Sequence, residues 1–181
     1  MSKAVMLSIR PKWREKIVNG DKTIEVRKTR PKLETPFKCY IYCTLPKYPH
    51  EDFIAADYPR PQFYGGGKVI GEFTCERIAL IAYDGGELSS TTNAAFSPAT
   101  CLTQSEIIAY IGDKGRCYGW HMSDLRIYDT PKELSEFKTL CRVDADCCAC
   151  PYYNYTKMDC DGRVIGRPPQ SWCYVEAMND A

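Results

Sequence analysis

The sequence lacks three features that would have narrowed its function at once. Its 181 residues carry no excess charge, because 24 Lys and Arg offset 23 Asp and Glu to a net charge of +1. A long nucleic acid therefore finds no overall positive field, and any contact with one must be small and local. No apolar run reaches the roughly 18 residues of a membrane span, and the N-terminus has no signal-peptide core. We expect a cytoplasmic protein without a membrane partner.

Histidine is scarce, with two residues, whereas cysteine is abundant, with eleven. An odd number excludes complete internal pairing, and without an export signal we expect reduced thiols or thiolates on metal. Six cysteines crowd the last quarter of the chain: Cys141, Cys147, Cys148, Cys150, Cys160 and Cys173. The remaining composition is that of one globular domain, so we expect a single domain over 1–181 with a Cys-rich loop insertion at 138–170 before the last strand.

Local patterns predict a mixture of strands and short helices. An apolar run at 4–9 indicates a buried strand, and Pro11 suits the first turn of a helix that ends at Gly20. Gly71 indicates a bulge or a close neighbour in the longest strand. Further strands are expected at 23–27, 37–44, 68–83, 119–128 and 171–177, a helix from Thr103 or Ser105 to Tyr110, and loops at 45–67 and 84–100. This content predicts a small α+β fold around an open or closed β-barrel.

The segment from Gly20 to Arg27 carries the strongest chemical signal. Thr23, Glu25 and Arg27 share one face of the expected strand, and Lys22 lies where that strand begins. Side chains two apart on a strand lie within ~7 Å, so Glu25 and Arg27 can bind one small polar ligand or bind each other. A carboxylate accepts from an exocyclic amine and a basic group donates to carbonyl or phosphate oxygens, as in recognition of a nucleobase. A structural ion pair is the alternative.

Several stretches of this sequence resemble one known family. Pro11-Lys12-Trp13, Ile17 and Gly20-x-Lys22-x-x-Glu25-x-Arg27 resemble the N-terminal signature of the ASCH domain, a member of the PUA-like superfamily. KVIGEF at 68–73 resembles the central strand of that family, and 118–137 together with the cysteine-bearing tail resembles a bacterial and phage subgroup. The resemblance implies a small PUA-like β-barrel with flanking short helices and a Cys-rich C-terminal excursion. Its cleft would bind RNA or a modified nucleoside or nucleotide.

The resemblance also implies the residues of the site. The ligand-binding candidates are Lys22, Thr23, Glu25, Arg27, Trp120 and His121. The last two are neighbours on a strand placed near the cleft, so only one of them is expected to face it. The basic run 27–32 adjoins the motif and is a candidate contact for a phosphate backbone. Trp13 is expected to pack with Ile17 in the core.

Two other functions stay open beside binding. One bacterial branch of the family removes the acetyl group of N4-acetylcytidine with a lysine, a threonine and a glutamate. Lys22 matches the lysine and Glu25 occupies the threonine position, so these two are catalytic candidates only if the chain is an enzyme, an amidohydrolase acting on an acylated nucleoside. The near-zero net charge suggests instead a protein-interaction accessory factor. Binding ranks above both.

The cysteine-rich tail suggests a structural metal. Cys147-x-x-Cys150 has the spacing of a zinc knuckle, and the candidate zinc ligands are Cys141, Cys147, Cys150 and Cys160. Reduced thiols and disulfides formed during purification are the alternatives. A redox CxxC is not expected, because the βαβ context of such a motif is missing.

Overall fold

The structure, a computed structural model, describes residues 2–45, 66–84, 86–92, 98–141, 153–154, 156, 159–160 and 163–178. The strands are β1 (Lys3–Ile9), β2 (Ile24–Arg27), β3 (Phe37–Cys43), β4 (Val69–Asp84), β5 (Glu87–Ser90), β6 (Arg116–Lys132), β7 (Tyr153–Asn154), β8 (Asp159–Cys160) and β9 (Trp172–Glu176). The helices are α1 (Pro11–Val18) and α2 (Gln104–Ile111), with short 3-10 turns at η2 (Pro98–Thr100), η3 (Gly112–Lys114) and η4 (Leu134–Glu136). The fold is mixed α+β, as predicted.

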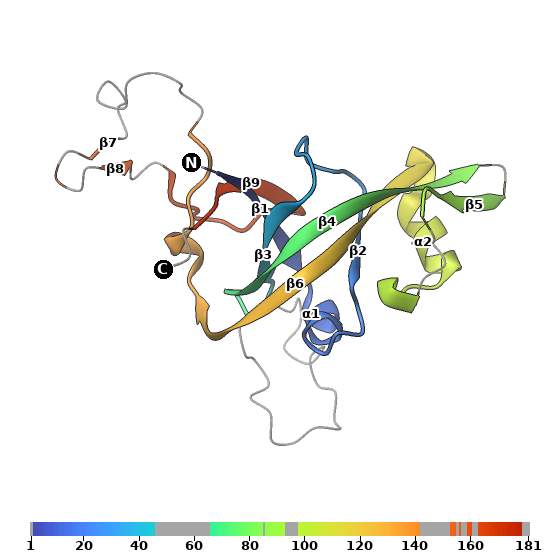
Figure 1. The fold of residues 1–181 in the computed structure, drawn as a ribbon, viewed down its shortest axis with the longest axis horizontal. Coiled ribbons are helices and arrows are strands. Elements are labelled where there is room, and N and C mark those ends of the chain that lie inside the picture. Colours follow the sequence, from blue (N-terminus) through green and yellow to red (C-terminus); the bar gives the residue numbers. More distant parts are fainter. Residues whose placement is uncertain are drawn as a thin grey trace.

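The main sheet has seven strands in the order β2-β6-β4-β3-β1-β9, with β5 paired to β4. β1 and β3 are parallel, and the other pairs are antiparallel. The long β4 and β6 run side by side across the molecule, and β5 and α2 lie at one end of this ribbon (Figure 1). β7 and β8 pair separately.

The sheet is not closed, which corrects the expected β-barrel. β2 and β9 are the two ends of the strand order, so no backbone ladder joins them in the part of the chain that the structure describes. Side chains connect these margins instead: the Arg27 guanidinium reaches the Ser8 carbonyl on β1 and Ser171 before β9. We call this gap between β2 and the β1–β9 pair the seam.

Both helices have clear local causes. α1 begins with Pro11, whose fixed φ suits the first helical turn, and it ends before Gly20, which has a φ of +79° that favours glycine. α2 begins at Thr103, whose hydroxyl accepts from the Glu106 backbone N–H while the Glu106 carboxylate accepts from the Thr103 backbone N–H. This reciprocal capping box satisfies two otherwise unpaired donors.

β2 has two faces with different surroundings. Ile24 and Val26 pack against Ile107 and Ile111 of α2 in one buried cluster. The alternate residues of the strand point to the opposite face, toward the seam, and all four residues of β2 are buried. The predicted alternation is therefore confirmed, but the polar face does not lie in open solvent.

The predictions for Gly71, for the loop at 84–100 and for the strand at 119–128 can be compared with the structure. A Cβ on Gly71 would lie 2.4 Å from the backbone oxygen of Arg126, and the β4–β6 register shifts beside it, so both the close neighbour and the bulge are present. Asp124 interrupts β6 with a φ of +49°. The expected loop at 84–100 contains β5, and β6 extends beyond the predicted 119–128. Residues 46–65 lie outside the described part.

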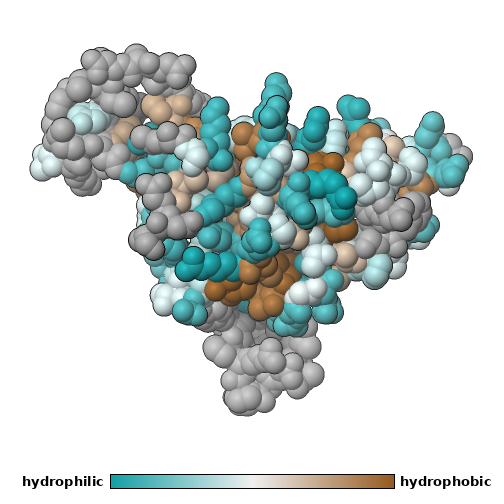
Figure 2. All heavy atoms as spheres, in the orientation of Figure 1, coloured by the Kyte–Doolittle hydropathy of each residue, from teal (hydrophilic) through white to brown (hydrophobic). Residues whose placement is uncertain are grey.

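Three further points concern an apolar area of the surface, membrane-spanning helices and the expected insertion. Apolar side chains gather in one area of the face that carries β6, bordered by polar ones (Figure 2), and Leu125 on β6 is among the exposed large apolar residues. In the described ranges, no helix has the length and apolar character needed to cross a membrane. The expected insertion at 138–170 is described only in part, because 142–152, 155, 157–158 and 161–162 lie outside the description.

Candidate functional site

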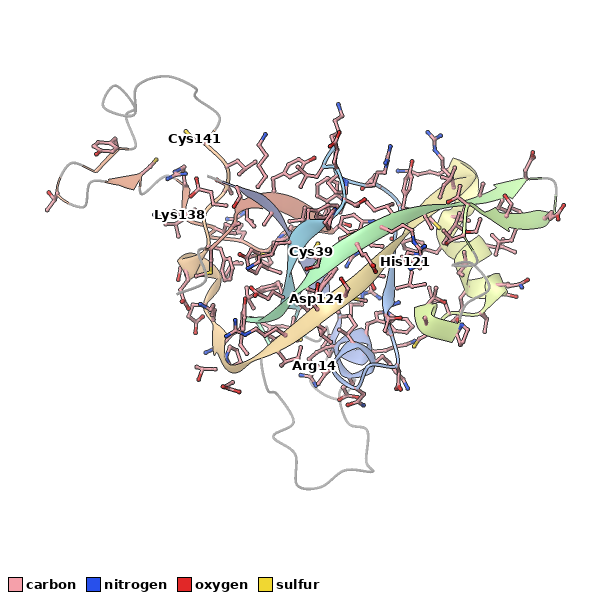
Figure 3. All side chains as sticks on the ribbon, viewed as in Figure 1. Arg14, Cys39, His121, Asp124, Lys138 and Cys141 are labelled. Atoms are coloured by element: carbon pink, nitrogen blue, oxygen red, sulfur yellow. The ribbon has the colours of Figure 1, made fainter. Side chains whose placement is uncertain are left out.

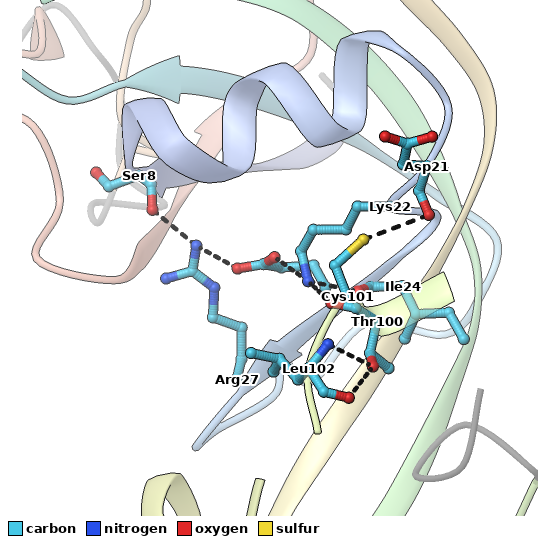
Figure 4. Close-up of polar contacts among 9 residues, drawn as sticks. Ser8, Asp21, Lys22, Ile24, Arg27, Thr100, Cys101 and Leu102 are labelled. Atoms are coloured by element: carbon cyan, nitrogen blue, oxygen red, sulfur yellow. Dashed lines mark hydrogen bonds and ion pairs between the residues drawn. The ribbon is translucent and has the colours of Figure 1, made fainter. Parts of the chain in front are cut away.

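A row of three charged side chains lies on the seam side of β2. The Glu25 carboxylate lies between two cations, with Oε2 at 3.4 Å from Lys22 Nζ and Oε1 at 3.0 Å from Arg27 Nη2. The exposed fractions of Lys22, Glu25 and Arg27 are 2%, 7% and 8%, so this is a buried network. Lys22 and Arg27 both extend beside α1 toward the Glu25 carboxylate (Figure 4). The mutual pairing of Glu25 and Arg27 that the sequence allowed is therefore present, and Lys22 joins it.

Backbone carbonyls use most of the hydrogen-bonding capacity of Lys22. Its ammonium donates to the Ile24 carbonyl at 2.9 Å and to the Thr100 carbonyl at 2.6 Å, and it forms an ion pair with Glu25 at 3.4 Å. Two of the three donors of an ammonium group are therefore used by the backbone. These contacts tie the start of β2 to the η2 turn.

Arg27 joins the two margins of the open sheet. Its Nη2 donates to the Ser8 carbonyl at 2.7 Å, and its Nη1 lies 3.3 Å from the Ser171 carbonyl and 3.2 Å from the Ser171 hydroxyl. The planar guanidinium presents five donors in a fixed geometry. One side chain can therefore bind β1, the segment before β9 and Glu25 at the same time.

A cavity of about 460 Å³ opens at the seam beside this row. The volume falls within the roughly 300–1,000 Å³ of small-molecule sites. Two aromatic side chains from different helices, Trp13 of α1 and Tyr110 of α2, contribute to its walls. Its full lining is Ser8, Ile9, Arg10, Trp13, Lys22, Glu25, Val26, Arg27, Thr44, Leu102, Glu106, Tyr110, Gln170 and Ser171.

The charges of the cavity nearly balance. Three basic side chains, those of Arg10, Lys22 and Arg27, face two acidic ones, Glu25 and Glu106. Hydrogen bonds from the backbone N–H and hydroxyl of Thr103 lower the pKa of Glu106, which keeps it ionised near neutral pH. The cavity is therefore suited to a polar ligand of small net charge better than to a highly charged one.

Tyr110 belongs to the same electrostatic environment. Burial raises its pKa, and the nearby Arg27 and Glu25 charges act on it in opposite directions. The phenol therefore stays neutral at physiological pH. Lys28, which follows β2, has its Nζ 5.1 Å from the centre of the Tyr110 ring. The basic stretch that begins at Arg27 thus continues from the cavity wall.

Three predicted ligand-binding residues do not line the cavity. Thr23 is exposed, and its backbone N–H donates to the Ala99 carbonyl. Trp120 is fully buried opposite Glu25 in the β2–β6 register and packs against Trp172 at 6.0 Å between ring centres. His121 is half-buried on β6 (Figure 3), with Nδ1 at 3.2 Å from Arg77 Nη2. Burial lowers its pKa, and the Arg77 charge adds to this shift.

The structure adds cavity residues that the sequence did not predict. Trp13 packs against the buried cluster that contains Ile17, as expected, but it also lines the cavity. Tyr110, Glu106 and Ser171 come from distant segments. For Glu106 and Tyr110 the only sequence signal is the capping pattern that positions α2, which does not show what the helix faces. Ser171 has no such signal.

The predicted zinc ligands are only partly within the described residues. Cys147 and Cys150 lie outside them, Cys141 is exposed, and Cys160 is buried in β8. Figure 3 places Cys141 toward the β7–β8 end of the molecule, whereas Arg14 marks α1 beside the cavity. Within the described ranges, no group of three or more His, Cys, Asp or Glu could hold a metal ion. A zinc site that uses the Cys147–Cys150 pair stays a prediction.

Comparison with known proteins identifies a fold. Neither family models nor curated proteins match this sequence. The crystal structure of ASCH from Zymomonas mobilis is 17% identical, with a TM-score of 0.55 over 96% of this chain and 87% of that one. A tyrosine-to-phenylalanine mutant of that protein is 17% identical, with a TM-score of 0.56 over 97% of this chain and 91% of that one. A serine-to-alanine mutant is also 17% identical, with a TM-score of 0.55 over 96% of this chain and 88% of that one. At this identity the likeness concerns the fold, and it supports the sequence resemblance to ASCH domains.

Proposed function

We propose that this chain, which has the ASCH fold, binds a nucleobase, free as a nucleoside or nucleotide or within single-stranded RNA, in the seam cavity. The observation that carries the proposal is the buried row of Lys22, Glu25 and Arg27 beside a cavity walled by Trp13 and Tyr110. Aromatic side chains offer flat surfaces to a base, and a fixed carboxylate offers acceptors to its edge.

The surface beside the cavity supports a nucleotide over other planar ligands. Lys28, Arg30 and Lys32 are exposed in the segment that follows β2. Lys28 lies over the Tyr110 ring of the cavity wall, and Arg30 lies 5.9 Å from the centre of the Tyr118 ring. Basic side chains next to a base pocket can bind phosphates that flank the base. The footprint is small, as the net charge of the chain requires.

The proposal is tested with nucleosides and short RNA on the same protein. Calorimetric titration uses the four ribonucleosides, and fluorescence anisotropy uses labelled pentaribonucleotides at low and moderate salt. Trp13→Leu should weaken binding by about tenfold or more, because contact between a base and an aromatic ring contributes about 1–3 kcal/mol. Thr23→Ala is the matched control, since Thr23 adjoins Lys22 but does not line the cavity, and it should bind as the wild type does.

Salt separates the two forms of ligand. Pentanucleotide binding should weaken as salt rises, because phosphate contacts release counterions, whereas nucleoside binding should change little. Replacing Lys28 and Arg30 together with alanine should reduce this salt dependence, with Lys114→Ala as an exposed basic control. Binding of neither nucleosides nor RNA would overturn the proposal and favour a protein-interaction role.

The contacts of Lys22 also set an expectation for hydrolysis. Incubation with N4-acetylcytidine should yield no cytidine, because the Lys22 ammonium donates to two backbone carbonyls and pairs with Glu25, and Glu25 occupies the threonine position of the family's catalytic pattern. Chromatographic separation of the two nucleosides is the measurement. Cytidine formation that disappears in Lys22→Met would contradict this expectation and establish the amidohydrolase alternative.

A further inference from the structure

The charged row leaves a specific pattern of unused hydrogen-bonding groups. Lys22 donates to two backbone carbonyls and forms an ion pair with Glu25, and the terminal nitrogens of Arg27 contact Ser8, Ser171 and Glu25. Arg27 Nε is buried and has no acceptor among the described residues. An unpaired donor of the row therefore belongs to the side chain beside Glu25 on the same strand face.

Glu25 supplies the unused acceptors. A carboxylate has about four acceptor sites, and the two observed partners, Lys22 and Arg27, each occupy one oxygen. Because Glu25 lines the cavity, the remaining sites are available to a ligand there. A complementary ligand edge presents two adjacent donors to Glu25 and, next to them, an acceptor that faces the positive charge of the Arg27 guanidinium.

Resting on the proposed function, we infer that the cavity selects guanine, with N1–H and the N2 amino group on the Glu25 carboxylate and O6 toward Arg27. Guanine alone among the four RNA bases carries an acceptor, a donor and a donor in this order along its pairing edge. Cytosine and adenine present one amino donor beside a ring acceptor, and uracil places one N–H between two carbonyl oxygens. In those three bases a ring nitrogen or a carbonyl oxygen would face the Glu25 carboxylate. Two acceptors would then meet with no hydrogen between them, which disfavours binding.

The charge of the cavity agrees with a neutral base. Its three basic and two acidic side chains give no excess negative charge that would favour an organic cation on Glu25. A carboxylate ligand would meet Glu25 itself. Guanine is neutral and planar, so the Trp13 and Tyr110 walls and the polar row can act on it together.

Guanosine and inosine provide the decisive comparison, because they differ only in the N2 amino group. In calorimetric titrations of the wild-type protein, guanosine should bind about ten- to a hundredfold more tightly than inosine, the range for losing one hydrogen bond to a charged group. Cytidine, adenosine and uridine should all bind more weakly than guanosine. Equal affinity for guanosine and inosine, or a preference for any other base, would overturn guanine selection while nucleobase binding stood.

Variants assign the preference to Glu25. Glu25→Gln replaces one acceptor by an amide donor and should abolish the difference between guanosine and inosine. Glu72→Gln is the matched control, since Glu72 is another largely buried carboxylate on a strand but does not line the cavity, and it should keep the preference. A preference that survives in a folded Glu25→Gln protein would overturn the assignment. The wild-type comparison of ligands needs no variant and decides the inference even if Glu25→Gln does not fold.

Discussion

Glu25 and Glu72 are both largely shielded carboxylates on strands, and each lies near a lysine, yet their surroundings differ. Glu25 lies between two buried cations beside a cavity. Glu72 accepts from the Tyr128 hydroxyl at 2.7 Å and lies 3.5 Å from Lys38, whose side chain is 28% exposed. Both carboxylates therefore have two side-chain partners, but Glu25 lines the seam cavity and Glu72 does not.

This difference shows why burial alone does not identify a site. A buried ion pair is weak evidence for stability, because desolvation offsets much of the attraction between its charges. Both clusters satisfy most of their polar atoms internally, as buried groups generally do. What distinguishes the Glu25 cluster is its place in the wall of a cavity of ligand size. The following predictions separate the two clusters, from the largest effect to the smallest.

Removing the lysine of each cluster should give unequal losses of stability. Lys22→Met should lower the free energy of unfolding by about 3–5 kcal/mol, because it breaks a buried pair and leaves Glu25 with one cation. Lys38→Met should cost less than about 1 kcal/mol, since Lys38 is partly solvated at 3.5 Å from its partner. Urea unfolding followed by tryptophan fluorescence measures both. Equal losses would show that the two clusters do not differ in this way.

Arg27→Lys should cost about 1.5–3 kcal/mol, the range for hydrogen bonds to charged groups. A lysine keeps the charge but cannot bind the Ser8 carbonyl, Ser171 and Glu25 together, as the guanidinium does. Arg30→Lys, at an exposed position, should change stability by less than about 0.5 kcal/mol. If both variants unfold at the same urea concentration, Arg27 does not hold the seam.

Tyr128→Phe should destabilise the protein by about 1.5 kcal/mol near neutral pH, because the Tyr128 hydroxyl donates to a carboxylate. Burial, together with the hydrogen bond to Glu72, raises the pKa of Tyr128 above its ordinary value of 10.0. The folded state therefore holds this proton more tightly than the unfolded state, so the contribution is complete below pH 10 and is lost as the pH rises above it. The difference in unfolding free energy between wild type and variant should shrink in that alkaline range. A difference in unfolding free energy that stays constant above pH 10 would contradict the expected link between stability and the Tyr128 proton.

Thr103→Ala should have the smallest of these effects, about 1 kcal/mol, the usual cost of removing an N-cap side chain. It removes the capping box of α2 but none of the groups on Lys22, Glu25 or Arg27. Urea unfolding gives the stability, and guanosine titration should show near wild-type affinity. A large loss of affinity with a small loss of stability would mean that the position of α2 sets the cavity more tightly than the charged row does.

The local elements of the fold could be predicted because their causes are local. Pro11 and Gly20 bound α1, Thr103 caps α2, and the alternation across β2 separates its two faces. Closure of the sheet could not be predicted in this way, since alternation determines which face a side chain occupies and not which strand lies alongside. For that reason the sequence left open and closed forms of the barrel undecided, and the described sheet is open. β5 was missed because the segment 84–100 contains turn-forming residues that conceal a short strand.

The candidate site likewise contains residues that local sequence predicted and residues that only distant contacts bring in. The motif identified Lys22, Glu25 and Arg27 because they lie within one short segment, and the structure brings these three together. The other walls come from residues far along the chain, and Ser171 lies 144 positions from its partner Arg27. Thr23 was predicted from the strand face that it shares with Glu25 and Arg27, and Trp120 and His121 from the resemblance. The cavity does not include these three residues.

The sequence alone determined that β2 would place Ile24 and Val26 on one side and Glu25 and Arg27 on the other, because side chains of an extended chain alternate. Only the tertiary structure decided that the polar side would be buried at an open margin of the sheet, with α1, α2 and the segment before β9 around it. The backbone of a strand sets the direction of its side chains, but the segments that pack nearby determine how far those side chains are exposed to solvent. Those segments are positioned by contacts across the whole chain.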